Sequence, residues 1–135
     1  MTLYYSTVLR TDEVSQIQTA VAAAGGQAIL NIYAGTEPAN CATALSGNTL
    51  LCTIDLPATF LTAANGATAI DGTWSGTGAS AAGTGTTATF FRILDSAGTC
   101  HVQGAIPADM TLQNTSIASG QTVTITSFTV TAGNA

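Results

Sequence analysis

The amino-acid sequence predicts a mainly β protein: an antiparallel β-sandwich of jelly-roll-like character with one N-terminal α-helix packed on it. Only one stretch of the chain carries apolar residues at helical spacing. Elsewhere short apolar or alternating runs are separated by turn-forming residues, which is the pattern of an all-β domain. The clearest run, residues 86–106, predicts a central hairpin with its turn at Asp95-Ser96-Ala97-Gly98. At 135 residues, one domain is expected.

The N-terminal part is expected to hold an arm followed by the helix. Residues 1–10 are rich in apolar side chains and are interpreted as an arm that docks on the domain or on a neighbouring molecule. The single sandwich domain then covers residues 11–135. Its helix is expected over residues 11–24, with Thr11 as the N-cap and Gly25-Gly26 as the stop. The apolar stripe of this helix should cover one face of the central hairpin, the face that carries Ala88, Phe90 and Leu94.

The remaining elements follow from alternation and turn chemistry. The composition of residues 71–85 (DGTWSGTGASAAGTG) predicts a flexible loop. The phase of alternation slips between Thr126 and Ser127, which predicts a β-bulge in the last strand. Further strands are expected at residues 28–33, 49–56, 110–115 and 121–131, with brief strands on either side of a turn at Asn65-Gly66.

Charge is scarce. Only 7% of residues are charged, the formal net charge is -5, and Arg10 and Arg92 are the only basic residues besides one histidine. A nucleic-acid partner is therefore not expected, because nothing could neutralise a run of phosphates. Apolar runs stay well short of the roughly 20 residues that span a bilayer, so no membrane partner is expected. The first five residues lack the basic and apolar regions of a signal peptide, which favours synthesis and assembly in the cytoplasm.

The three cysteines, Cys41, Cys52 and Cys100, have no metal-like spacing. Free thiols are the preferred interpretation. A pair between Cys41 and Cys52 is the alternative under oxidising conditions. No metal or cofactor is expected.

The sequence offers no catalytic constellation. His101 is the only histidine and lies on a hairpin strand, so a structural or interfacial role is expected. The seven acidic residues lie mostly at turns or at the helix start; a pair of them acting in glycoside hydrolysis stays a minor alternative. The glycines of residues 76–85 lack the lysine and the following helix of a phosphate loop. We expect no enzyme.

Interface contacts are expected instead. Arg92 is the polar exception on its strand, and we expect it to pair with Asp12 or Glu13 on the helix, or with an acid of another subunit. Aromatic side chains are typical interface anchors, although they also build sugar-stacking platforms. The sugar platform would use Trp74, Tyr4, Tyr5 and Tyr33. The candidate interface residues are Leu3, Tyr4, Tyr5, Trp74 and Arg92.

Three segments resemble a family of small structural proteins of tailed-bacteriophage virions. They are LNIYAGTEPANCATALSGNTLLCTIDL (30–56), TATFFRILDSAGTCHVQG (87–104) and ADMTLQNTSIASGQTVTITSFTVTAG (108–133), in this order behind an N-terminal helix. These motifs are structural, so the resemblance transfers no active-site residues. It implies a head decoration or cement protein on the outer capsid surface, with the major capsid protein and copies of itself, as a dimer or trimer, as partners. A tail component, a carbohydrate-binding virion module and a hydrolase are the alternatives.

Overall fold

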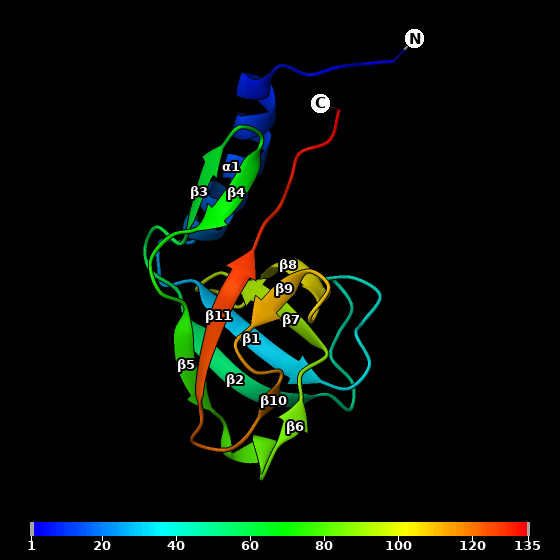
Figure 1. Cartoon of the computed structure of the whole chain (residues 1–135), viewed down its shortest axis with the longest axis vertical. Coiled ribbons are helices and arrows are strands. Elements are labelled where there is room, and N and C mark those ends of the chain that lie inside the picture. Colours follow the sequence, from blue (N-terminus) through cyan, green and yellow to red (C-terminus); the bar gives the residue numbers. More distant parts are fainter. Residues whose placement is uncertain (1, 135) are drawn as a thin grey trace.

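The computed structural model describes residues 2–134 and contains a seven-stranded antiparallel sheet in the order β8-β7-β1-β2-β5-β11-β9 (Figure 1). The sheet curves into a nearly closed sandwich, and a short turn joins its two edge strands, β8 and β9. The predicted mainly β sandwich with one N-terminal helix is confirmed. The elements are α1 (Thr7–Ala22), β1 (Ile29–Ala34), β2 (Thr49–Asp55), β3 (Leu61–Ala64), β4 (Ala67–Ile70), β5 (Ser75–Gly78), a 3-10 turn (Ser80–Ala82), β6 (Thr86–Thr87), β7 (Phe90–Leu94), β8 (Cys100–Ala105), β9 (Met110–Leu112), β10 (Ser116–Ile117) and β11 (Thr122–Phe128).

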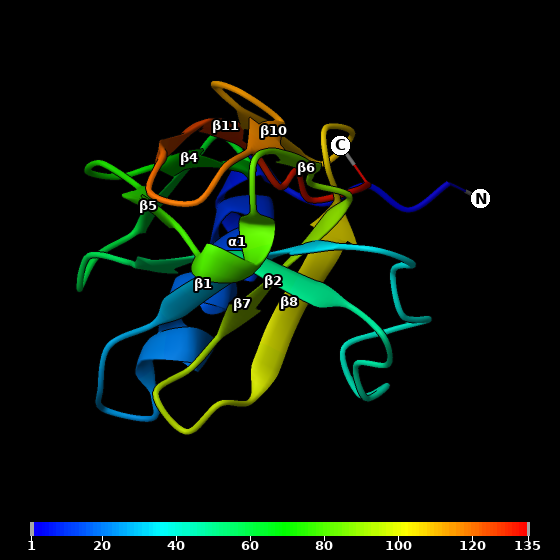
Figure 2. The ribbon, with the colours of Figure 1, turned by 90° about the horizontal axis from the view of Figure 1, so that it is seen from below.

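The core lies between two groups of strands. Seen from below, β1, β2, β7 and β8 lie on one side, and β5, β10 and β11 lie on the other (Figure 2). Alternate residues of each strand point inward, which is why β1 contributes Leu30 and Ile32 while β11 contributes Val123 and Ile125. The predicted bulge in β11 is confirmed, since its register with β9 shifts between Ile125 and Ser127.

Trp74 lies at the centre of this core. Its ring is fully buried, with its centroid 6.0 Å from that of Phe60 and 5.8 Å from that of Phe128. The expectation that Trp74 anchors an exposed loop to a partner is therefore corrected. The tryptophan side chain packs between the rings of Phe60 and Phe128 as part of the apolar core.

A smaller lobe stands on one end of the sandwich (Figure 1). It consists of α1, the β3–β4 hairpin and residues 129–134, and we call it the lobe. The hairpin turns at Asn65 and Gly66, both with positive φ, as the asparagine-glycine pair predicts. The chain after β11 runs along β4, where Thr68 N donates to Val130 O and an isolated bridge joins Ala67 to Thr131.

The helix starts earlier than predicted and covers a different surface. Ser6, not Thr11, is the N-cap, with its Oγ accepting from Leu9 N at 3.1 Å. Thr11 instead accepts from Gly66 N in the hairpin turn, and Gln18 Oε1 accepts from the backbone N–H groups of Phe60 and Leu61. These polar contacts attach α1 mainly to β3 and β4, so it does not cover the face of β7.

Residues 71–85, expected to be a flexible loop, contain an interior strand of the sheet. β5 pairs with β2 on one side and with β11 on the other. Its glycines allow this close approach: a Cβ on Gly76 would lie 2.8 Å from Thr53 O, and one on Gly78 would clash with the carbonyl of Ala118. Glycine here permits close packing of neighbouring backbones.

Candidate functional site

The outer face of β7 is covered by residues 35–48, which we call the strap. The strap links β1 to β2 and crosses over β7 to β8. Tyr33 of β1 pairs with Phe90 of β7, and their rings stack with centroids 5.1 Å apart. The helix contacts β3 and β4 instead, so the expectation that it covers the face with Ala88, Phe90 and Leu94 is wrong.

Arg92 holds the strap from below. Its Nη2 donates to Asn40 O at 3.2 Å and to Thr43 O at 2.6 Å, while its Nε donates to Gln103 Oε1 at 2.8 Å. The guanidinium is almost fully buried. The predicted pairing of Arg92 with Asp12 or Glu13 is wrong, since the helix lies elsewhere, and Arg92 is no surface group for a partner.

The strap is also bonded covalently to β8. Cys41 and Cys100 form a disulfide, and Cys52 is the free cysteine, buried in the core. Both sequence-based expectations, three free thiols or a Cys41–Cys52 pair, are therefore wrong. Cys52 points into the core, away from the outer face that the strap crosses, and burial raises the pKa of its thiol to about 11.

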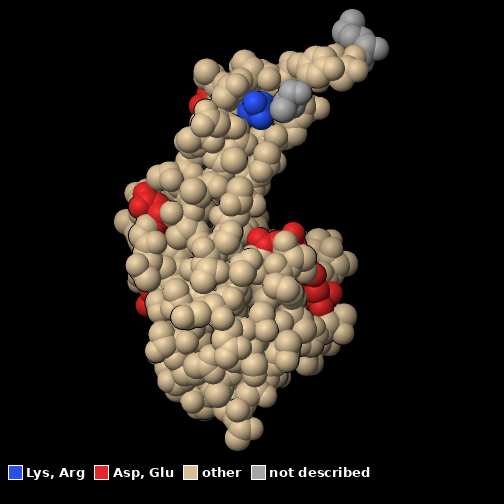
Figure 3. Space-filling view, in the orientation of Figure 1, with Lys and Arg blue, Asp and Glu red and all other residues tan. Residues whose placement is uncertain are grey.

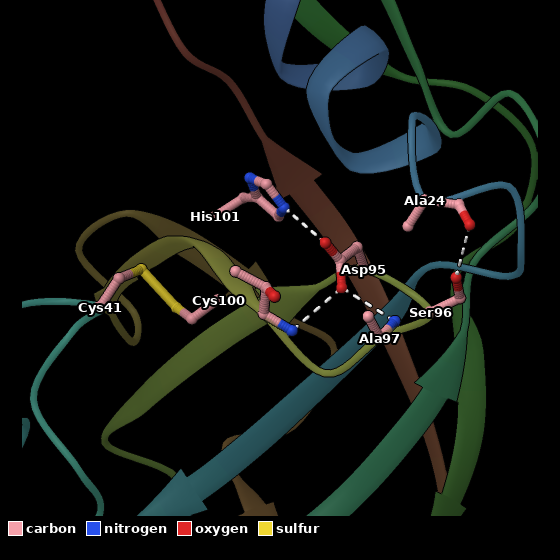
Figure 4. A network of polar contacts seen from close by, with 8 residues as sticks. Ala24, Cys41, Asp95, Ser96, Ala97, Cys100 and His101 are labelled. Atoms are coloured by element: carbon pink, nitrogen blue, oxygen red, sulfur yellow. Dashed lines mark hydrogen bonds and ion pairs between the residues drawn. A yellow bond between two sulfur atoms is a disulfide. The ribbon is translucent and has the colours of Figure 1, made fainter.

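His101 follows the disulfide and bonds to the turn of the central hairpin (Figure 4). Its Nε2 lies 2.9 Å from Asp95 Oδ2, while Asp95 Oδ1 accepts from Ala97 N and Thr99 N. The hydrogen bond with His101, followed by that with Thr99, holds the pKa of Asp95 below its ordinary value of 3.8. The neighbouring hydroxyl, Ser96 Oγ, donates to Ala24 O, so this turn fastens the end of the helix segment to the sandwich.

Among residues 2–134, four of the six large exposed apolar side chains lie at the far end of the lobe, whereas Leu45 lies on the strap and Leu50 on β2. Tyr4 is 69% exposed and Val8 72% exposed, and Leu3 and Leu9 are exposed as well. We call these four residues the apolar end. They lie on residues 2–6, which we call the arm, and on the first turn of α1. The arm extends away from the molecule, and Tyr5 N donates to Asn134 O at its base (Figure 1).

The four aromatic residues of the possible sugar platform do not come together. Tyr4 and Tyr5 lie at the arm, Tyr33 is buried against Phe90, and Trp74 is enclosed in the core. Their separation removes the geometric basis of a sugar-stacking surface.

Within residues 2–134, no three His, Cys, Asp or Glu side chains converge as metal ligands would. The described chain also has no helix with the length and apolar character required for a membrane span. Charged groups are sparse on the face in Figure 3, which also shows a hollow between the lobe and the sandwich.

One pocket, with a volume of about 410 Å³, lies at the C-terminal end of α1. It opens between the turn that follows the helix and the link from β2 to β3. Its walls include small or apolar residues such as Ala22, Leu56 and Phe60, and Gln27 is the polar residue among them. All of its lining residues are uncharged.

Comparison with known proteins gives no match to a protein-family model, to a curated protein or to a solved structure.

Proposed function

We propose that this chain is a non-enzymatic structural protein of a tailed-phage virion, a head decoration or cement protein that binds the outer capsid surface. The observation that carries the proposal is the apolar end, which presents Leu3, Tyr4, Val8 and Leu9 at the extremity of a projecting lobe. Apolar side chains gathered at one extremity mark a protein interaction surface. The resemblance of residues 30–56, 87–104 and 108–133 to small phage virion proteins suggests the capsid as partner.

The mechanism is geometric. The sandwich is a rigid body, since its core rings interlock and the disulfide and Arg92 fix the strap. The lobe places its apolar end away from that body, where the first turn of α1 reaches a neighbouring surface. Each contact is modest, but capsid symmetry repeats it many times, and many copies together oppose rupture of the shell. Assembly in the host cytoplasm and a final place on the virion are part of this proposal.

The carbohydrate-binding alternative receives no support from the geometry, because Trp74 is buried and the tyrosines are dispersed. The tail-component alternative uses the same apolar end, and the partner used in the experiment separates it from the head role.

The experiment is co-sedimentation of the purified protein with capsids that lack it. We expect saturable binding at a fixed ratio to the major capsid protein. Replacing Val8 and Leu9 with serine should weaken that binding by at least about tenfold, since two exposed apolar contacts are lost. Leu45→Ser is the matched control, because Leu45 is an exposed leucine on the strap, 39% exposed and far from the apolar end in the sequence.

Wild-type binding by Leu45→Ser together with loss of binding by the double variant supports the proposal. Absence of any binding by the folded wild-type protein contradicts the head role. Binding that survives replacement of Val8 and Leu9 contradicts the assignment of the apolar end as the contact.

A further inference from the structure

We propose that the strap is a redox-controlled cover over Arg92, closed while the Cys41–Cys100 disulfide is intact and opened when a dithiol reduces that bond. In the open form the guanidinium of Arg92 is exposed on the outer face of the sheet. The inference goes beyond the proposed function, since it concerns the isolated protein and involves no capsid.

Arg92 lies on a face of the sheet that is otherwise partly open to solvent. Its cross-strand neighbours are Asn31 on β1 and Gln103 on β8, and residues directly opposite one another point to the same face. Both neighbours are polar and partly exposed, whereas Arg92 is only 6% exposed. The adjacent residues of β7, Phe91 and Ile93, belong to the core on the other face. The strap, whose carbonyls accept from the guanidinium, therefore accounts for the burial of Arg92.

A single turn of the strap carries both the cover and the covalent attachment. Asn40 O and Thr43 O accept from Arg92 Nη2. Cys41 follows Asn40 in the sequence and is bonded to Cys100 of β8 (Figure 4). The side chain of Asn40 closes this turn, because its Oδ1 accepts from Thr43 N. Reduction of the disulfide therefore releases the same turn that covers Arg92.

Little else holds the strap closed. No residue from 35 to 48 is buried, so the strap gains little stability from apolar burial. Its ordered conformation nevertheless costs conformational entropy. Besides the disulfide and Arg92, single hydrogen bonds such as that from Gln103 Nε2 to Pro38 O attach it to the sheet. Without the disulfide, open conformations of the strap become populated.

The charge of Arg92 also favours the open form. Among residues 2–134 the only ion pair is that of Asp95 with His101, so no carboxylate neutralises Arg92. The guanidinium donates to two backbone carbonyls and to one amide oxygen, all of them neutral. Neutral acceptors replace only part of the hydration that a buried charge loses. Opening of the strap returns this charge to water.

The disulfide is accessible to a reductant. Cys41 and Cys100 are partly exposed, whereas Cys52 is fully buried and takes no part. A thiolate of the dithiol attacks one sulfur, and the other cysteine leaves as a thiolate that takes up a proton. The second thiol of the reductant then displaces the first cysteine from the mixed disulfide. Two electrons and two protons pass to Cys41 and Cys100, and the dithiol becomes a disulfide. The cover is thus open where thiol reductants prevail and closed in an oxidising compartment.

Modification of arginine by phenylglyoxal is the measurement. Arg10 and Arg92 are the only arginines and the chain has no lysine, so trypsin cleaves the denatured chain after these two residues alone. A modified arginine resists trypsin, and the peptide masses report each site separately. Arg10 is partly exposed on α1 and serves as the internal reference. The protein is labelled either oxidised, or reduced with dithiothreitol that is removed without air before labelling.

Reduction should accelerate the modification of Arg92 at least about tenfold and leave that of Arg10 unchanged, because the reaction follows the population of the open strap. The double variant Cys41→Ser/Cys100→Ser should show the fast reaction with and without dithiothreitol. Cys52→Ala is the matched control, since it removes the free thiol and keeps the disulfide. It should respond to dithiothreitol as the wild type does.

If Arg92 stays unreactive in a reduced protein whose Cys41 and Cys100 are measured as thiols, hydrogen bonds alone hold the strap closed and the proposal is overturned. A shift of Trp74 fluorescence to that of the unfolded chain also overturns it, because reduction would then unfold the core in which Trp74 is buried. The labelling uses no capsid, so a failure of the capsid experiment leaves this result unchanged and the two proposals fail separately.

Discussion

Asp95 organises the turn of the central hairpin with a single side chain. One carboxylate oxygen accepts from two backbone N–H groups and the other lies 2.9 Å from His101 Nε2. Each of these bonds favours the ionised carboxylate, which is why the pKa of Asp95 is lowered below 3.8. The lowered pKa makes the pair of Asp95 and His101 a source of stability that depends on pH.

The Asp95→Asn variant should lose less stability in acid than the wild type does. A group with a lowered pKa in the folded state contributes its stability above the unfolded value, and this contribution is lost as the pH falls through the folded value. The contribution of this carboxylate to stability is therefore lost over a pH range that begins near 3.8 and extends below it. The melting temperature measured from pH 6 to pH 2 should fall more steeply for the wild type. Asparagine retains an acceptor for Ala97 N and Thr99 N, so the turn stays intact.

At pH 6 the wild type should melt at a higher temperature than Asp95→Asn, and the two curves should converge in acid. Asp71→Asn provides a matched control, because it removes one carboxylate elsewhere in the chain. Parallel curves for the wild type and Asp95→Asn would show that this carboxylate does not titrate with folding.

Single residues also mark the limit of prediction from sequence. The turn role of Asp95 and the structural role of His101 could be predicted, because turn chemistry is local. The burial of Trp74 and Arg92 could not, since both depend on segments distant in the sequence: Phe128 packs on Trp74, and the strap carbonyls of Asn40 and Thr43 receive Arg92. The glycine-rich sequence around Trp74 is the same whether the tryptophan is buried or exposed. The sequence around Arg92, a single charge on a strand, likewise does not show whether the arginine is buried.

At the scale of elements, the strap is a long connection that is fixed to the sheet by hydrogen bonds and by a disulfide. It joins two adjacent strands, β1 and β2, yet it crosses the outer face of the sheet instead of turning directly. Gln103 Nε2 donates to Pro38 O at 2.7 Å, which adds a polar contact to those of Arg92. The Cys41–Cys100 disulfide closes a loop with a sequence separation of 59 residues.

Removal of this disulfide by Cys41→Ser should lower the free energy of unfolding by up to about 4 kcal/mol, because a long closed loop restricts the unfolded chain strongly. Urea denaturation with and without reductant is the measurement. The wild type should lose stability in reductant, whereas Cys41→Ser should respond little. Hydrogen exchange in residues 36–48 should accelerate in the reduced wild type and in the Cys41→Ser variant.

Cys52→Ala is the control for this prediction, because Cys52 is a buried free thiol. This variant should keep its sensitivity to reductant. Equal stability of the wild-type protein with and without reductant would contradict the structural role of the disulfide.

Elements with strong local signals could be predicted, and elements formed by close packing could not. The central hairpin, the strands β1 and β2 and the bulge of β11 follow from alternation and turn residues. β5 could not be predicted, because Gly76 and Gly78 also suit a flexible loop, and their role appears only when neighbouring backbones approach. The predicted start of α1 was too late in the sequence, because Thr11 has the chemistry of an N-cap but accepts a hydrogen bond from the hairpin turn instead.

The whole molecule combines a sandwich with a lobe assembled from three distant parts of the chain. α1 contacts β3 and β4, and the C-terminal residues form hydrogen bonds with β4, with the turn of the hairpin and with the arm. Leu3 and Tyr4, two of the expected interface residues, are exposed at the apolar end, and their role in an interface stays a prediction. The pocket could not be predicted, since its walls come from the end of α1 and from the link between β2 and β3.

The C-terminal segment is a structural part of the lobe. Thr68 is buried and exchanges bonds with Val130: Thr68 N donates to Val130 O, and Val130 N donates to Thr68 Oγ1, both at 2.9 Å. Ala132 N donates to Gly66 O in the hairpin turn. Without these partners the free edge of β4 and the buried hydroxyl of Thr68 are left unsatisfied, which is costly inside a protein.

Deletion of residues 130–135 should therefore destabilise the lobe more than the sandwich. We expect a loss of about 2–4 kcal/mol from the lost hydrogen bonds and the lost burial of Val130. Hydrogen exchange should accelerate in β3, β4 and α1, while β1 and β7 stay protected, because their core of Leu30, Ile93 and Phe91 is untouched. Deletion of residues 133–135 alone is the control: it removes the acceptor of Tyr5 N and leaves the bonds of Val130 and Ala132. Uniform acceleration across both parts would mean that lobe and sandwich unfold as one cooperative unit, and the apolar end would then be positioned by the whole fold.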